Sequence, residues 1–152
     1  MGREILNIRL AGLSLLPASA RKPRLLEAAV RRAFSREKSK KSGEVNIIFV
    51  SGKDMRAMNL EFLGHDYDTD VIAFEHPPAP DIPAAETPIG DIYISSTMAA
   101  RQARELGHAV LREVLTLAVH GALHLLGHDD ASPRAKARMF RRQDEILERL
   151  KA

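Results

Sequence analysis

Residues 108–130 have the sequence HAVLREVLTLAVHGALHLLGHDD, and the rest of the architecture can be worked out from this segment. Apolar residues surround nearly the whole of a helix over His108–Leu126, which is the pattern of a buried helix. Within it, His120 and His124 are four residues apart and therefore lie on one face, one turn apart. Two such imidazoles can chelate one metal ion. The segment therefore predicts a long, buried helix that holds a metal.

The residues after His124 can complete the coordination sphere. Gly127 predicts the end of the helix, and a turn there can bring the carboxylate of Asp130 back to the same ion. His128 is the alternative third ligand, because it would lie one turn from His124 if the helix continued. We expect His120, His124 and Asp130 to be the ligands. Three protein ligands leave one coordination position open, as in catalytic zinc sites.

Composition restricts the metal and its chemistry. The chain has no cysteine, which excludes thiolate ligands and disulfides and suits a cytoplasmic location. We expect one zinc ion per chain, and two histidines with an aspartate also suit iron, cobalt or nickel. Zinc peptidases of the H-E-x-x-H type carry their glutamate base directly after the first histidine. That position is Gly121 here, so peptide hydrolysis is disfavoured.

Length and hydropathy indicate one globular domain. The chain has 152 residues, of which 45% are hydrophobic and 28% charged, and we expect residues 1–152 to form a single metal-dependent hydrolase domain. No apolar run reaches the roughly 18 residues that a transmembrane helix needs. Charges occur too early for a signal peptide, so we expect no membrane association.

The remaining patterns predict a small sheet and four further helices. Alternation and β-branched content predict strands over Glu4–Leu10, Val45–Val50, Thr69–Phe74 and Asp91–Ser95. Helices are expected over Arg24–Phe34, over Met55–Leu63 after an N-cap at Ser51, from Ser95 or Ser96 to Leu106, and from Pro133 to about Leu150. Five prolines make His76–Pro88 an irregular loop. This order predicts an α+β fold in which a small mixed β-sheet of about four strands packs with helices, one of them a zincin-like metal-bearing helix.

Charge is segregated along the chain although the net charge is only +3. Residues 21–41 hold nine Lys or Arg against two Glu, whereas residues 60–91 hold eight acids and no Lys or Arg. The segment from Ala131 onward is basic again. Basic flanks around an acidic, histidine-bearing centre suit a polyanionic substrate. The alternative for residues 21–41 is a solvated helix face and loop.

Three motifs in the same order resemble a known family. HGALHLLGHDD at 120–130 is similar to the signature of the YbeY family of bacterial rRNA maturation factors. MNLEFLGHDYDTDVIAF at 58–74 resembles the family's segment around its Thr-Asp/Asn-Val-Leu-Ser-Phe strand, and PIGDIYIS at 88–95 resembles its Leu-Gly-Asp-Ile-x-Ile-Ser strand. The resemblance implies a metal-dependent endoribonuclease for single-stranded RNA, acting in 16S rRNA 3′-end maturation and ribosome quality control. It implies ribosomal RNA and ribosomal particles as partners.

Two positions depart from the pattern of that family. Many members end the metal motif with His where this chain has Asp130, and an aspartate oxygen is also a normal zinc ligand. Many members carry an arginine implicated in RNA cleavage at the position that matches Leu63 here. Leu63 favours an alternative function, a ribosome- or RNA-binding assembly factor with a mainly structural metal and little or no nuclease activity.

An RNA substrate would need proton transfer and phosphate contacts. We expect His65 and His128 to be the candidate catalytic residues, because imidazole titrates near neutrality. The expected phosphate-contacting surface lies in the basic segment 21–41 and is formed by Arg31, Arg32, Arg36, Lys38, Lys40 and Lys41.

Overall fold

The computed structural model describes residues 5–77 and 80–150. Glu4, where the first predicted strand begins, and Pro78, within the predicted loop, lie outside the described residues. Across the described part of the chain, the predicted order of strands and helices is confirmed, and the fold is α+β with a four-stranded mixed sheet. None of the described helices is long and apolar enough to cross a membrane.

The sheet is mostly parallel. Its strands are β1 (Leu6–Ala11), β2 (Gly43–Val50), β3 (Val71–Glu75) and β4 (Pro88–Ser95), and their spatial order is β1-β2-β4-β3. β1, β2 and β4 are parallel, whereas β3 runs antiparallel to β4 at one edge. β4 begins at Pro88, three residues before the predicted Asp91, because Gly90 pairs with both Val45 and Glu75 despite its poor strand propensity.

Five α-helices follow the predicted pattern. They are α1 (Pro23–Arg36), α2 (Gly52–Leu63), α3 (Ser96–Leu106), α4 (Val110–Leu125) and α5 (Pro133–Glu148), with short 3₁₀ turns at Leu13–Leu15, Ala18–Ala20 and Ala84–Glu86. Ser51, Ser95 and Ser132 cap three of them by accepting a hydrogen bond from the backbone N–H three residues later. The Ser51 cap starts α2 at Gly52, three residues before the predicted Met55.

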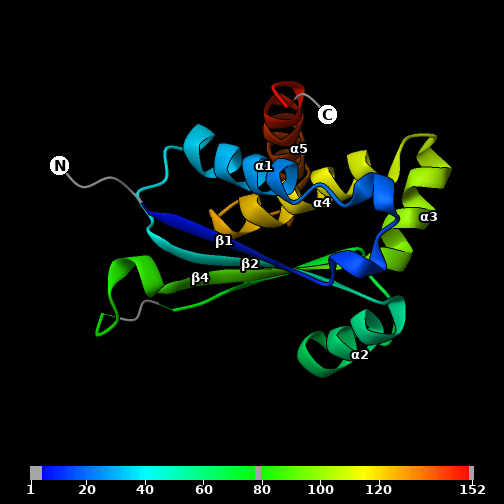
Figure 1. The fold of residues 1–152 in the computed structure, drawn as a ribbon, viewed down its shortest axis with the longest axis horizontal. Helices are drawn as coiled ribbons and strands as arrows, with labels where there is room; N and C mark the ends of the chain where they lie inside the picture. Colours follow the sequence, from blue (N-terminus) through cyan, green and yellow to red (C-terminus); the bar gives the residue numbers. More distant parts are fainter. Residues whose placement is uncertain (1–4, 78–79, 151–152) are drawn as a thin grey trace.

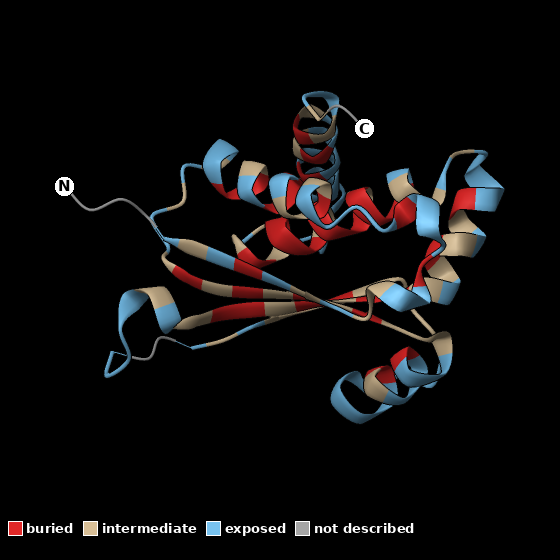
Figure 2. Ribbon diagram, viewed as in Figure 1, coloured by how far each residue is buried: buried red, intermediate tan, exposed pale blue. Residues whose placement is uncertain are grey.

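The helices lie mainly on one face of the sheet. In Figure 1, α1 and α4 cover one face, α5 stands beyond α4, and α2 lies under the opposite face. The residues of β2 and β4 that point toward α1 and α4 are Val45, Ile47, Phe49, Ile92 and Ile94, which are at most 2% exposed. Figure 2 shows this buried layer between the sheet and the two helices. The buried character predicted for residues 108–126 is therefore confirmed for α4.

Two glycines let α4 approach the sheet closely. A Cβ atom on Gly121 would lie 2.5 Å from Cγ2 of Ile92, and one on Gly90 would lie 2.4 Å from Cδ2 of Leu125. Both distances are too short for a Cβ contact, so a side chain at either position would force the facing side chain, the strand or the helix to shift. Position 121 therefore points at the sheet, and the missing peptidase glutamate could not be added there without such a shift.

Candidate metal centre

Three side chains form a cluster that could hold a metal ion. His120 and His124 project from α4, and Asp130 follows the turn at Gly127, where φ is +97°. Their nearest ligand atoms all lie within 4.8 Å of one another, and the Nε2 atoms of the two imidazoles are 3.2 Å apart. Both histidines are half-buried and Asp130 is exposed. The helix thus supplies two imidazole nitrogen donors, and the loop supplies a carboxylate at the open side.

Gln143 of α5 determines which nitrogen of His120 faces the cluster. The Nδ1 atom of His120 lies 3.0 Å from the Oε1 atom of Gln143, and Gln143 is only 4% exposed. An amide oxygen accepts hydrogen bonds, so the proton of His120 is held on Nδ1. The lone pair of Nε2 is then available to a cation, which is how metal-binding histidines are usually oriented.

The environment of His124 also favours the neutral imidazole. Burial and the neighbouring His120 lower the pKa of His124 from its ordinary value. The carboxylates of Asp130 and Asp129 and a hydrogen bond to the backbone of His128 act in the opposite direction without reversing the shift. A neutral imidazole is the form that binds a metal, so the donor set fits a divalent transition ion.

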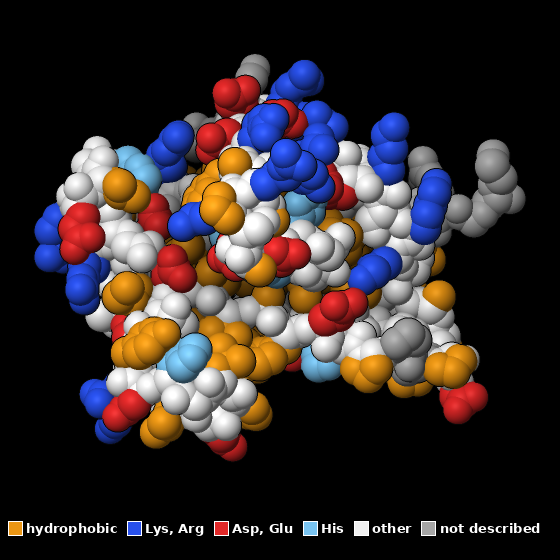
Figure 3. Space-filling view, turned by 180° about the vertical axis from the view of Figure 1, so that it is seen from behind, with side chains coloured by type: hydrophobic (Ala, Val, Ile, Leu, Met, Phe, Trp, Pro, Cys, Tyr) orange, Lys and Arg blue, Asp and Glu red, His pale blue; other side chains and the backbone are white. Residues whose placement is uncertain are grey.

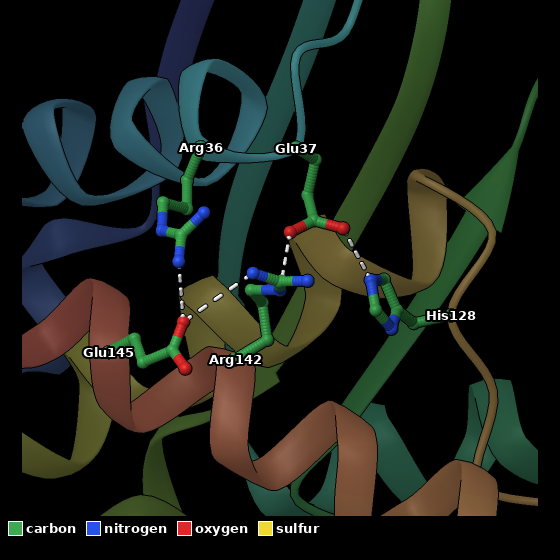
Figure 4. A network of polar contacts seen from close by, with 5 residues as sticks. All are labelled: Arg36, Glu37, His128, Arg142 and Glu145. Carbon is green, nitrogen blue, oxygen red and sulfur yellow. Dashed lines mark hydrogen bonds and ion pairs between the residues drawn. The ribbon is translucent and has the colours of Figure 1, made fainter.

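His128 is held away from this cluster. Its Nε2 atom contacts the carboxylate of Glu37, at the end of α1, as Figure 4 shows. The other carboxylate oxygen of Glu37 forms an ion pair of 2.9 Å with Arg142 of α5. Arg142 and Arg36 then share Glu145, at 3.5 and 2.8 Å. The network joins three parts of the fold: the end of α1, helix α5, and the loop that follows α4. It therefore fixes the start of that loop, which carries Asp130.

His65 contacts neither the cluster of His120, His124 and Asp130 nor the network around Glu37 in the interactions that the structure shows. It follows α2, and its ring stacks on Tyr67 at a centroid distance of 5.3 Å, with Nδ1 3.2 Å from the Tyr67 hydroxyl. Leu63, the last residue of α2, is 49% exposed. α2 covers the face of the sheet opposite α4 (Figure 1). The arginine of α2, Arg56, forms an ion pair of 2.8 Å with Asp66.

The six predicted phosphate-contacting residues differ in their surroundings. Arg31, Lys38, Lys40 and Lys41 line a hollow of about 480 Å³ at the end of α1. Arg36 is engaged by Glu145, and Nε of Arg32 is buried. Lys41 contacts the backbone oxygen of Leu125 at 3.2 Å, so it lies at the end of α4.

A second basic surface adjoins the first. Arg134, Arg138, Arg141 and Arg142 of α5 line a hollow of about 490 Å³, and Figure 3 shows Lys and Arg side chains gathered over this helix. Arg138 and Arg142 also line the neighbouring hollow that contains His128. We call the surface formed by Arg134, Arg138, Arg141 and Arg142 the arginine face. It leads from α1 to the loop that carries Asp130.

Sequence reasoning missed three features of this site. The supporting Gln143, the anchoring Glu37 and the arginine face were not among the expected residues. Gln143 has a recognisable signal, since it is a polar residue on the buried face of α5 between Met139 and Ile146. Glu37 is one of only two acids in the basic segment 21–41.

Comparisons with known proteins show the family to which this chain belongs. A family model described as endoribonuclease YbeY matches residues 17–151. The chain belongs to the endoribonuclease YbeY family. It is similar to the endoribonuclease YbeY of Elusimicrobium minutum, with 48% identity over 82% of this chain and 85% of the relative. The Geobacillus thermodenitrificans protein of that name is 42% identical over 82% of this chain and 83% of its own.

A solved structure supports the fold of this YbeY family member. The solution structure of TM1509 from Thermotoga maritima matches with a TM-score of 0.59 and 28% identity, over 93% of this chain and 87% of that chain. The expected family and fold class are thereby confirmed, and the family is one of nucleases, which are hydrolases. The roles of individual site residues stay predictions.

Proposed function

We propose that this YbeY family member is a zinc-dependent endoribonuclease that acts in 16S rRNA 3′-end maturation and ribosome quality control. The observation that carries the proposal is the convergence of His120, His124 and Asp130, within 4.8 Å, at the end of a buried helix. Ribosomal RNA and ribosomal particles in the cytoplasm are the proposed partners. The cysteine-free composition and the basic surface support that location and that substrate class.

The side chains of the site have distinct proposed tasks. His120, His124 and Asp130 would hold the ion, which when bound would polarise a phosphoryl oxygen and lower the pKa of a water molecule. Gln143 keeps Nε2 of His120 free of a proton. Glu37, through His128, anchors the loop that carries Asp130. These contacts hold the donors in place before the substrate arrives.

Two basic surfaces are proposed to bind the RNA backbone. The first is the predicted group Arg31, Arg32, Arg36, Lys38, Lys40 and Lys41. The second is the arginine face, whose hollow of about 490 Å³ is next to the one that contains His128. Phosphates bound along both would pass beside the loop that carries Asp130, which suits a single strand approaching the cluster.

His128 and His65 remain the proposed proton-transfer groups. His128 is two residues from Asp130, and its Nε2 atom contacts the carboxylate of Glu37. His65 is exposed and would have to act from the loop after α2. In pH profiles of RNA cleavage, replacement of the participating histidine by Gln should remove one limb, whereas replacement of the other should leave both limbs.

Metal analysis and RNA cleavage together test the proposed function. We expect purified protein to contain zinc and to cut single-stranded RNA, with activity lost on chelation and restored by zinc. His124→Ala and Asp130→Ala should each lose the ion, whereas the matched variant His128→Ala should retain it, with an affinity weakened only by the loss of the contact with Glu37. An ion kept by Asp130→Ala but lost from His128→Ala would contradict the ligand set.

A second candidate function rests on Leu63. An exposed aliphatic side chain at the position of the family arginine supplies no cation to an RNA substrate, which favours a ribosome-bound assembly factor with a structural metal. Under that function, RNA binding survives His120→Ala and no cleavage occurs. Leu63→Arg separates the two functions, because it should raise an existing cleavage rate but create none in an assembly factor.

A further inference from the structure

A hollow of about 370 Å³ begins at His120 and runs between α3, α4 and α5. One wall follows the face of α4 that carries Glu113, Thr116 and His120. The volume lies within the range of about 300–1,000 Å³ that is typical of small-molecule sites. It is therefore large enough for one nucleobase beside the candidate metal centre.

The lining of this hollow carries an excess of negative charge. Asp70, Glu113 and Asp144 contribute carboxylates, against one guanidinium from Arg112. Glu113 is 4% exposed, and its Oε1 atom lies 2.7 Å from Nε2 of His108, so this acid has a partner inside the wall. The excess repels a phosphate but attracts a neutral ring that presents N–H groups. The hollow is thus suited to a base rather than to the RNA backbone.

The side chains around the opening suit the two faces of a flat ring. Leu106 of α3 is 66% exposed and Phe140 of α5 is 42% exposed, and both line the hollow. The ring of Phe140 lies 6.1 Å from that of His120. Large apolar side chains beside polar groups are the usual setting for an unstacked base of single-stranded RNA. Asp144, which is exposed, and Gln102, whose Nε2 atom lies 3.3 Å from Asp70, also line the hollow.

We propose that this hollow is a base-binding subsite that holds the nucleobase next to the cleaved phosphodiester and prefers bases with an exocyclic amino group. The proposal rests on the endoribonuclease function proposed above. Asp144 accepts a hydrogen bond from the amino group, while Leu106 and Phe140 cover the ring. Guanine, adenine and cytosine have such a group, whereas the one free N–H of uracil lies between two carbonyl oxygens that a carboxylate repels, so uracil is disfavoured at this position.

Cleavage of a randomised single-stranded RNA pool tests the subsite. Sequencing of the products should show one position beside the cut at which uracil is depleted. Asp144→Ala should reduce that preference about tenfold, the effect of one hydrogen bond to a charged group. Glu148→Ala, which removes another exposed acid of α5 one turn later, should leave it unchanged. An unchanged preference in Asp144→Ala, or the same loss in both variants, would overturn the subsite.

Binding of free nucleosides separates this proposal from the proposed function. Guanosine and cytidine at millimolar concentration should shift the backbone NMR signals of Gln102 and Thr116 more than uridine does, and Thr116→Phe, which fills the hollow, should abolish the shifts. If wild-type protein binds guanosine there but cuts no RNA, the proposed function fails and the subsite stands. If it cuts RNA but no nucleoside shifts these signals, the subsite is wrong.

Discussion

At the scale of single residues, the candidate centre depends on groups that are not ligands themselves. Gln143 is buried by α5 and fixes the ring of His120 through Nδ1. His124 is kept neutral mainly by burial and then by its neighbour His120, which lower its pKa. The chemistry of the two ligands is therefore set by burial and by one amide.

Gln143→Leu should weaken metal binding about tenfold or more without unfolding the protein. The substitution keeps the volume of the side chain but removes the acceptor that orients His120, and loss of such supporting contacts typically costs about 10–100-fold in metal affinity. Competition with a chromogenic chelator measures the change. Gln102→Leu is the matched control and should bind as the wild type does; equal affinities for all three proteins would contradict the role of Gln143.

Metal affinity should resist mild acid. Because the pKa of His124 lies below its ordinary value of about 6.5, protons compete with the ion for this imidazole less than they do for an ordinary histidine. We expect proton competition at His124 to begin at a lower pH than at an unshifted histidine. A lowered folded-state pKa also means that the metal-free protein loses stability as pH falls from the ordinary pKa of histidine toward the lowered pKa of His124. Chelator competition and thermal unfolding over the pH series check both, and an NMR titration in which the ring of His124 in the metal-free protein protonates at or above its ordinary pH would refute the shift.

At the scale of the elements, α4 is positioned by contacts along one side and at its C-terminal end. Gly121 brings it against Ile92 of β4, and Lys41 reaches the backbone oxygen of Leu125. Beyond the helix, Glu37 at the end of α1 holds His128, and Arg142 of α5 in turn pairs with Glu37 (Figure 4). The helix and the loop that carries Asp130 are thus fixed by three separate elements.

Gly121→Ala should destabilise the protein by about 1–2 kcal/mol. The new Cβ atom would lie 2.5 Å from Cγ2 of Ile92, and the cost of overpacking exceeds the gain of about 1 kcal/mol in helix propensity. Chemical denaturation measures the free energy of unfolding. The double variant with Ile92→Ala should lose less than the sum of the two single losses, and strict additivity would show that the contact is not the cause.

Glu37→Gln should loosen the loop that carries Asp130. The substitution removes the charge that faces His128 and Arg142, while Arg142 keeps Glu145. We expect a loss of about 1 kcal/mol in unfolding free energy and a weaker metal affinity. Glu27→Gln, on the same helix, is the control and should change neither. A full retention of metal affinity in Glu37→Gln would show that the anchor is dispensable.

At the scale of the whole molecule, basic and acidic surfaces lie on different sides of the candidate metal centre. The arginine face and the end of α1 lie on one side of the loop that carries Asp130, and the acidic hollow lies beside His120. A single strand can therefore keep its phosphates on basic surface while one base enters the acidic hollow.

RNA affinity should depend on salt through the arginine face. Arg138→Gln combined with Arg141→Gln removes two cations, and each phosphate contact contributes about 0.7 to the slope of log affinity against log salt for single strands. We expect the slope to become shallower by about 1.4. Arg24→Gln combined with Lys53→Gln removes two cations elsewhere and should leave it unchanged. Fluorescence anisotropy with a labelled RNA at several salt concentrations measures the slopes, and an unaltered slope would place the RNA elsewhere.

Local sequence signals were sufficient for the elements and for the central donors. The apolar pattern around His120 and His124 indicated α4, and Gly127 indicated the turn before Asp130. Ser51 was expected as a cap, but α2 begins three residues before the predicted Met55. These signals act over one or two turns, so periodicity and capping capture them. The start of β4 was wrong by three residues because Pro88 and Gly90 conceal a strand that pairing with β2 imposes.

The sequence by itself therefore determined the α+β order, the family and the pair of histidines, because each depends on residues close together in the chain. Only the tertiary structure decided what surrounds them. Gln143 lies 23 residues from His120, and Glu37 lies 91 residues from His128. Such contacts form because α1 and α5 pack on α4, and packing joins residues whose separation in sequence carries no signal. The acidic hollow and the arginine face arise in the same way, from helices that meet only in the folded protein.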